Sequence, residues 1–237
     1  MKYKLILARL QGKAAARTAF CGYLQMIEIE LKYAIPDKDT AENIWQDSGI
    51  VKMEEPESRE KLHFKAAYFD TADGDLAHND MAFRVRLEGS RVVATLKWNG
   101  KSDGPLHTRE EINAPIDGED CLIMPDPTIF KESGTGQQML KLIDGKPLVN
   151  VMEIGFLRRR VRVDTGKSII EVSVDTGEIA TDSGSMPICE LELELFSGQQ
   201  DDLMNLGKLL AERYALVPES RSKYARGLSL AVALPLL

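Results

Sequence analysis

The clearest pattern in the chain is a strict alternation of apolar and charged residues at positions 27–32. Alternation with a period of two is typical of a β-strand that has one apolar and one polar face. On such a strand Glu28, Glu30 and Lys32 project to the same side. Two carboxylates one strand step apart can share a hard divalent cation, and the lysine can neutralise an anion held by that cation.

The same alternation recurs along the chain and predicts eight strands in mostly antiparallel order. The seven further strands are expected at residues 62–70, 83–88, 92–98, 106–114, 156–163, 169–175 and 188–196. Turn-forming residues at 88–90 and 164–167 predict hairpins. Helices are expected at 37–49, 126–133, 137–143 and 199–214, and the last of these has an apolar stripe. In the first helix, Asp37 or Asp39 is expected to cap the start and Gly49 the end.

These elements predict an α+β fold that is mainly antiparallel β, with an eight-stranded closed barrel and flanking helices. Closure leaves no exposed strand edge. The few predicted helices must cover the apolar strand faces from outside, which leaves the charged faces pointing inward. The barrel should therefore be a tunnel with a charged, water-filled interior, the opposite of an ordinary soluble barrel.

Composition adds limits to this prediction. The net charge of −7 argues against a non-specific nucleic-acid binder. Cys21, Cys121 and Cys189 are far apart, which fits a reducing compartment and argues against a thiolate zinc site. No apolar run is long enough for a membrane span, so we expect a cytoplasmic protein without membrane contact.

Residues 1–25 differ from the rest of the chain because they carry several basic residues and no acidic one. They are expected to be an N-terminal extension outside the fold, with Met26 a plausible true start. The tunnel domain is then predicted to span residues 26–237.

The charged residues that share strand faces form a set of both signs. The acids are Glu28, Glu30, Glu111, Asp175, Glu190 and Glu192, with Glu88, Glu171 and Glu194 as further candidates. The bases are Lys32, Arg84, Arg86, Lys97, Arg109, Arg158, Arg160 and Lys223. A dry core would not tolerate so many ions, so they line either a solvated cavity or a salt-bridged outer surface. Their recurrence on at least six strands favours the cavity, where a phosphate chain with bound magnesium would match both signs.

Several of these stretches resemble one known family. Glu28-Ile29-Glu30-Leu31-Lys32 resembles the ExExK signature of the triphosphate tunnel metalloenzymes, also called the CYTH superfamily. The resemblance continues in order with Tyr68-Phe69-Asp70-Thr71, Phe83-Arg84-Val85-Arg86, Thr95-Leu96-Lys97, Leu106-His107-Thr108-Arg109-Glu110-Glu111, Val174-Asp175-Thr176-Gly177-Glu178, the alternating stretch 187–195 and Ser222-Lys223. It extends over residues 26 to about 230. The last two stretches look most like the bacterial inorganic triphosphatase branch.

The resemblance implies an enzyme that hydrolyses inorganic triphosphate to phosphate and diphosphate with Mg²⁺ or Mn²⁺. By matching positions, the metal ligands would be Glu28, Glu30, Asp175, Glu190 and Glu192. The substrate would be bound by Lys32, Arg84, Arg86, Lys97, Arg109, Arg158, Arg160 and Lys223. Lys97, Arg109 and Glu192 would take part in catalysis.

Other functions of the same fold stay open at this point. These are an adenylate cyclase, a thiamine or nucleoside triphosphatase, and a non-catalytic polyphosphate-binding module. The complete set of acids argues against mere binding. Tyr68 and Trp98 are candidates for stacking on a base, but a lone aromatic residue more often packs in the barrel wall. The expected partner is a small-molecule triphosphate, and a homodimer is possible.

Overall fold

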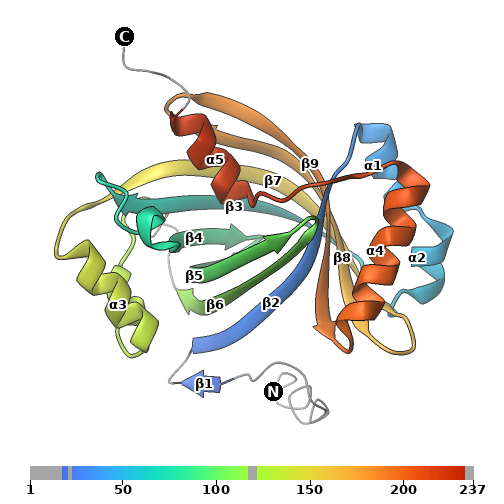
Figure 1. The fold of residues 1–237 in the computed structure, drawn as a ribbon, viewed down its shortest axis with the longest axis horizontal. Helices are drawn as coiled ribbons and strands as arrows, with labels where there is room; N and C mark the ends of the chain where they lie inside the picture. Colours follow the sequence, from blue (N-terminus) through green and yellow to red (C-terminus); the bar gives the residue numbers. More distant parts are fainter. Residues whose placement is uncertain (1–17, 21–22, 117–121, 233–237) are drawn as a thin grey trace.

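The structure, a computed structural model, describes residues 18–20, 23–116 and 122–232. It is a β-barrel with helices packed on its outside (Figure 1). The strands are β1 (Thr18–Phe20), β2 (Tyr23–Ala34), β3 (Glu60–Thr71), β4 (Ala82–Glu88), β5 (Arg91–Asp103), β6 (Leu106–Ile116), β7 (Leu148–Asp164), β8 (Ile169–Thr181), β9 (Gly184–Ser197) and β10 (Val217–Pro218). The helices are α1 (Lys38–Trp45), α2 (Ser48–Met53), α3 (Gly134–Ile143), α4 (Gln200–Tyr214) and α5 (Lys223–Val232), with short 3₁₀ turns η1 (Ala77–Asn79) and η3 (Pro127–Phe130).

Strands β2 to β9 close into an antiparallel barrel in the order β2-β6-β5-β4-β3-β7-β8-β9, and β9 pairs again with β2. Strand β2 makes this closure because it is long enough to pair with two neighbours. It pairs with β6 over Leu24–Leu31 and with β9 over Glu30–Ala34. Strands β1 and β10 lie outside the barrel and pair only with β2. The predicted mainly antiparallel, closed eight-stranded barrel with flanking helices is therefore confirmed.

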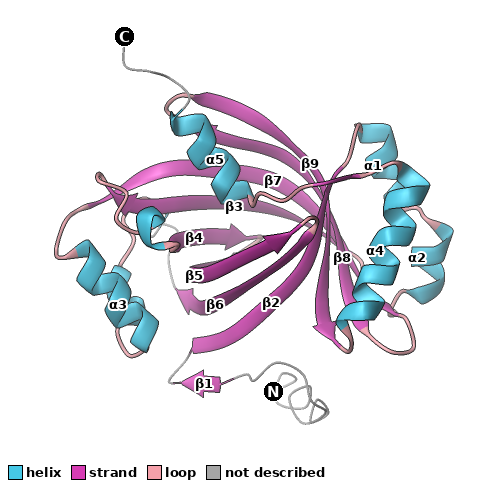
Figure 2. Cartoon of the chain, in the orientation of Figure 1, coloured by secondary structure: helices cyan, strands magenta, loops and turns pink. Residues whose placement is uncertain are grey.

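The barrel has its apolar residues on the outside, under the helices. Leu31 of β2, Val163 of β7 and Leu193 of β9 are fully buried in one cluster that packs against α1, α2 and α4. A second cluster joins the outer faces of β4 and β5 to η3 and α3, around Phe83 and Phe130. Figure 2 shows these two helical groups on opposite sides of the barrel, with α5 placed separately over β7, β8 and β9. The alternation of the strands thus leaves the charged faces inside.

The start of the first barrel strand differs from the prediction. Strand β2 begins at Tyr23, before the alternating segment 27–32 in which the strand was expected, because its backbone pairing with β6 continues to Leu24 opposite Asn113. Part of the predicted extension is therefore strand, since β1 also falls within residues 1–25. Residues 1–17 lie outside the described residues.

The single helix predicted at 37–49 is wrong, because two helices occupy this region. The side chain of Asp37 accepts a hydrogen bond from the Thr40 amide at the start of α1. The side chain of Asp47 accepts from the amides of Gly49 and Ile50 and starts α2. Gly49 is therefore in the first turn of a second helix, not at the end of the first.

The other predicted helices are closer to the structure. The helix expected at 126–133 is only the 3₁₀ turn η3, whereas α3 and α4 match the segments predicted at 137–143 and 199–214. Helix α5 was not predicted. Among the described residues, no helix combines the length and the apolar character needed to cross a membrane.

We expect Gly177→Ala to destabilise the barrel. A β-carbon at Gly177 on β8 would overlap the carbonyl oxygen of Gly155 and lie 2.5 Å from the Cα of Phe156, so the backbone of β7 would have to move. The free energy of unfolding should fall by about 1–3 kcal/mol, the usual cost of overpacking. Denaturant unfolding measures this change. The control is Gly155→Ala, because the space around that β-carbon is open; equal losses for both variants would contradict the prediction.

Candidate functional site

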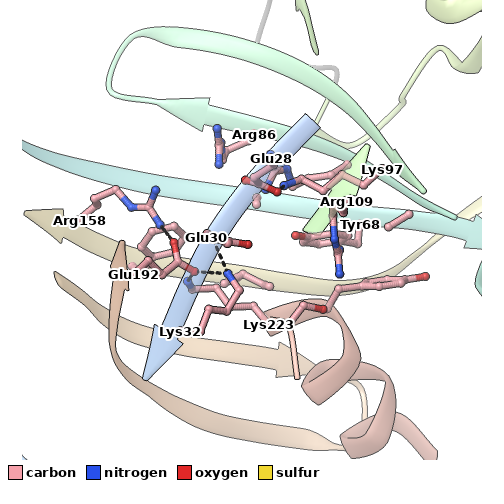
Figure 3. A pocket seen from close by; sticks show the side chains of 17 residues that line it. Glu28, Glu30, Lys32, Tyr68, Arg86, Lys97, Arg109, Arg158, Glu192 and Lys223 are labelled. Carbon is pink, nitrogen blue, oxygen red and sulfur yellow. Dashed lines mark hydrogen bonds and ion pairs between the residues drawn. The ribbon is translucent and has the colours of Figure 1, made fainter. Parts of the chain in front are cut away.

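The interior of the barrel contains a charged cavity of about 70 Å³, shown in Figure 3. Strands β2 to β7, strand β9 and helix α5 contribute its lining. The charged lining residues are Glu28, Glu30, Lys32, Arg84, Arg86, Lys97, Arg109, Arg158, Glu192 and Lys223. The structure therefore brings most of the predicted site residues together. Of the residues assigned to metal, substrate or catalysis, Arg160, Asp175 and Glu190 do not line this cavity. The other candidate acids Glu88, Glu111, Glu171 and Glu194 do not line it either.

The alternation of β2 places its two glutamates and its lysine inside the barrel, where lysines bridge the strands. The Nζ of Lys97 on β5 lies 2.7 Å from a carboxylate oxygen of Glu28 and 2.8 Å from one of Glu111. The Nζ of Lys32 lies 2.8 Å from Glu30 and 2.6 Å from Glu192. Each lysine is thus held between two carboxylates.

A second group of acids surrounds the ammonium of Lys223, at the start of α5. Asp175, Glu190 and Glu192 each offer a carboxylate oxygen, and these oxygens lie within 4.8 Å of one another. The Nζ of Lys223 is 2.7 Å from Asp175 and 2.9 Å from Glu192, and it also pairs with Glu190. The ammonium therefore occupies the position that a metal ion would need in this group.

Arginines occupy the remaining oxygens of these acids. Arg158 binds Asp175 through two bonds of 2.8 and 2.7 Å and also pairs with Glu192. Arg226 of α5 pairs with Glu190. Asp175 and Glu190 are 0% and 1% exposed, so these pairs are removed from solvent. Two of the predicted metal ligands are thus engaged by cations of the chain itself.

Negative charge is also concentrated around Glu194 and around Glu30, whose ion pair is with Lys32. The two residues face each other across β2 and β9, and Glu171 lies opposite Glu194 on β8. No ion pair of Glu194 is found within the described part of the chain. Burial and the charges of Glu28, Glu30 and Glu171 raise the pKa of Glu194 well above its usual range. The sequence offered Glu194 only as a further candidate, although it continues the alternation of Glu190 and Glu192.

The pKa values of the β2 glutamates agree with this view. Burial and the charge of Glu28 raise the pKa of Glu30 to about 7, despite the nearby Lys32. Burial also acts on Glu28, but Lys97 and Lys32 outweigh it and lower the pKa of Glu28 to about 2. Carboxylates that repel one another at this position suit a hard divalent cation, which prefers oxygen ligands. Glu28, Glu30 and Glu194 are therefore oxygen donors of the kind that a divalent cation prefers. Among the described residues, the carboxylate oxygens that already lie within 4.8 Å of one another are those of Asp175, Glu190 and Glu192.

The opposite wall of the cavity carries arginines with spare donors. Arg84 donates one bond of 3.1 Å to the hydroxyl of Thr95, and its buried Nε has no partner among the described residues. Arg86 pairs with Glu88, and its Nε is likewise without a partner there. Burial and the neighbouring Arg84 lower the pKa of Arg86, which shows that positive charge is crowded on this wall. Arg109 lies on β6, beside Glu28 in the strand register, and has no ion pair within the described residues.

Arg160 lies farther along β7, outside this cavity. Its guanidinium is 2.6 Å from Glu60 and 3.6 Å from Glu171, and its side chain is partly exposed. It follows Arg158 by one strand step, so it shares the inward face but lies beyond the cavity.

The cavity lining also includes uncharged residues, of which the sequence had offered Tyr68 only as a candidate for stacking on a base. Tyr68 of β3 and Ser222 and Tyr224 beside and within α5 line the cavity. Helix α5 is fixed over β7 to β9 by its ion pairs with Glu190 and by the close approach of Gly227 to Met152. The Ser222-Lys223 motif was the only sequence signal that this segment reaches the tunnel.

Comparisons with known proteins agree on one family. A sequence profile of the CYTH domain matches residues 26–228. An inorganic triphosphatase from Haemophilus influenzae is 31% identical over 209 residues, which are 86% of this chain and 55% of that protein. The chain thus spans about half the length of this curated relative.

Solved structures share the fold. HpAC1 from Hippeastrum, described with a dominant triphosphatase activity, superposes with a TM-score of 0.61 at 19% identity, over 85% of this chain and 95% of that one. A protein from Pyrococcus horikoshii OT3 superposes with a TM-score of 0.53 at 19% identity, over 85% of this chain and 98% of that one. At these identities the two structures support the barrel architecture alone.

We expect the metal-free protein to become more stable as the pH falls from about 8 to about 6. The pKa of Glu30 in the folded chain is about 7, above the usual 4.5, so the folded state holds this proton more tightly than the unfolded state. This contribution to stability is complete below the unfolded pKa and is lost as the pH rises through the folded pKa. Melting temperatures in the presence of a chelator measure the effect.

The substitution Glu30→Gln should reduce this pH dependence, and Glu178→Gln, at an exposed position of β8, should leave it unchanged. Mg²⁺ should raise the melting temperature more at about pH 8 than at about pH 6, because the cation and the proton compete for the same carboxylates. A Glu30→Gln protein with the pH dependence of the unsubstituted chain would contradict the assignment.

Proposed function

The chain belongs to the CYTH domain family, and we propose that its barrel hydrolyses inorganic triphosphate to phosphate and diphosphate with Mg²⁺ or Mn²⁺ bound. The observation that carries this proposal is the separation of charge inside one cavity. Carboxylates gather on β2 and β9, and buried arginine donors without a partner among the described residues lie on β4. A metal-bound phosphate chain requires these two surfaces to face each other.

We assign the arginine wall to the substrate. Arg84, Arg86 and Arg109 would bind the phosphate oxygens, since their guanidinium groups have few protein partners to give up. Donors that are already in place stabilise the charge that develops on the leaving diphosphate without reorganisation. Lys97 and Lys32 would bind the substrate from a position between the two walls, because each contacts an acid of β2 and faces the cavity.

We assign the metal to the opposite wall. Glu28, Glu30 and Glu192 of the predicted ligands line the cavity, and Glu194 lies opposite Glu30 in the strand register. Asp175 and Glu190 would instead hold Lys223 and α5 in place. A bound divalent cation supplies charge neutralisation on the phosphate oxygens and lowers the pKa of a water molecule. The chain itself needs no serine, cysteine or histidine nucleophile for this reaction.

The relatives support the proposal without deciding it. The Haemophilus influenzae protein is named an inorganic triphosphatase, and the part that matches this chain is 31% identical. Since this chain spans about half of that protein, the activity is carried over here as a proposal. The enclosure of the cavity by strands on all sides also favours a substrate as slender as a phosphate chain.

We expect Arg109→Ala to reduce kcat/KM for inorganic triphosphate by about 10²–10³-fold while changing the melting temperature little. Arg109 lines the cavity without an ion pair among the described residues, so its loss leaves no carboxylate unpaired. Lys97→Ala should lose activity and stability together, because it leaves Glu28 and Glu111 without their shared cation. Lys101→Ala, at an exposed position of the same strand as Lys97, is the control. Full activity of Arg109→Ala would remove Arg109 from the proposed site.

We expect kcat/KM for inorganic triphosphate to exceed that for ATP by at least about tenfold, which is roughly 1.4 kcal/mol of transition-state discrimination. The charged walls account for a short phosphate chain, and a nucleoside would add bulk at one end. Phosphate release from triphosphate, ATP and thiamine triphosphate, with and without Mg²⁺ or Mn²⁺, measures this preference. Cyclic AMP as the main product from ATP would favour a cyclase, and equal kcat/KM values would indicate a broad nucleotide triphosphatase.

A further inference from the structure

Two stacked tyrosine rings form part of the cavity lining where α5 meets the barrel. The rings of Tyr68 on β3 and Tyr224 on α5 lie 5.0 Å apart between centroids, with an angle of 19° between their planes. Both residues line the cavity and are at least nine-tenths buried. The stacked pair therefore places two phenol hydroxyl groups, one from each tyrosine, in the same region of the cavity lining.

The hydroxyl of Tyr68 lies among the cations of the arginine wall. Tyr68 is opposite Arg84 in the strand register, and the guanidinium carbon of Arg84 is 5.9 Å from the centre of the tyrosine ring. Burial raises the pKa of this phenol, but Arg84 and Lys97 outweigh burial and lower it. The phenol of Tyr68 therefore lies in the same part of the cavity as the cationic groups of Arg84 and Lys97.

The hydroxyl of Tyr224 has different surroundings. It is buried and makes no hydrogen bond within the described part of the chain. Burial and the charge of Asp70 raise the pKa of this phenol. Asp70 accepts hydrogen bonds from the amides of Thr71, Leu76 and Ala77 and is 1% exposed, so Tyr224 is influenced by a structural carboxylate and not by the arginines.

We propose that the hydroxyl of Tyr68 contacts the substrate directly, donating a hydrogen bond to a phosphate oxygen that Arg84 and Lys97 also bind. The proposal rests on the proposed function, because it names a further substrate-binding group of the same site. Positive charge is already crowded where Arg84 and Arg86 adjoin, so another cation there would increase repulsion. A phenol instead supplies a donor with no added charge. The stack on Tyr224 fixes the direction in which that donor points.

The pair of substitutions Tyr68→Phe and Tyr224→Phe tests this assignment. Each variant keeps the stacked ring and removes one hydroxyl, so the packing of α5 is retained in both. Tyr68→Phe should lower kcat/KM for inorganic triphosphate by about 10- to 100-fold, the range for one hydrogen bond to a charged group, with little change in melting temperature. Tyr224→Phe should leave kcat/KM unchanged, because its hydroxyl has no partner to lose among the described residues.

Calorimetry measures the binding of triphosphate with Ca²⁺ present or without metal. It separates the role of Tyr68 in substrate binding from the proposed hydrolytic activity of the protein. The Kd should rise for Tyr68→Phe and stay constant for Tyr224→Phe. Unchanged kcat/KM and Kd in Tyr68→Phe would overturn the assignment. Equal losses of kcat/KM in the two variants would also overturn it, because they would indicate that the tyrosine pair serves to position α5. If the unsubstituted protein binds triphosphate without hydrolysing it, the proposed activity fails, and the Kd comparison alone decides the role of Tyr68. If it neither binds nor hydrolyses triphosphate, both proposals fail.

Discussion

The structure depends on the cost of removing charged groups from water. A barrel interior that holds carboxylates, lysines and arginines is stable only if each ion has a partner of opposite sign or reaches solvent. Lys32, Lys97 and Lys223 provide such partners for the acids of β2, β8 and β9. Among the described residues, the charged groups of the interior without an ion pair include Glu194 on β9, Arg84 on β4 and Arg109 on β6. These unpaired charges are the groups that the proposed metal and triphosphate would neutralise.

The same constraint determines the outside of the barrel. Because a strand has two faces, charged residues inside require the apolar residues to point outward, where they would meet water. Leu31 and Leu193 avoid this only because α1, α2 and α4 cover them. The helices are therefore a requirement of the charged interior and not separate additions to a barrel that could exist alone.

Sequence predicted those features that depend on local periodicity. The alternation at Glu28, Glu30 and Lys32 placed them on one face of a strand, and the recurrence of that pattern along the chain predicted the closed barrel and turned that face inward. The partner of each charge could not be predicted, because it depends on the register between distant strands and on α5. Lys223 reaches Asp175, Glu190 and Glu192 only in the folded chain. The division at Asp47 was missed because a glycine near a helix end can follow either a C-terminus or a new N-cap.

The closure between β2 and β9 has a consequence for how the chain is made. The two strands meet through pairs such as Lys32 and Glu192, which are 160 residues apart in the sequence. A ribosome releases the first strand long before the last one exists, so the growing polypeptide cannot form the tunnel in stages. Its outward apolar rows and unpaired strand edges stay exposed until β9 has emerged, which is the condition under which β-rich chains aggregate. Production of the protein in cells should therefore depend on the folding assistance available during that interval, and not only on the stability of the finished barrel.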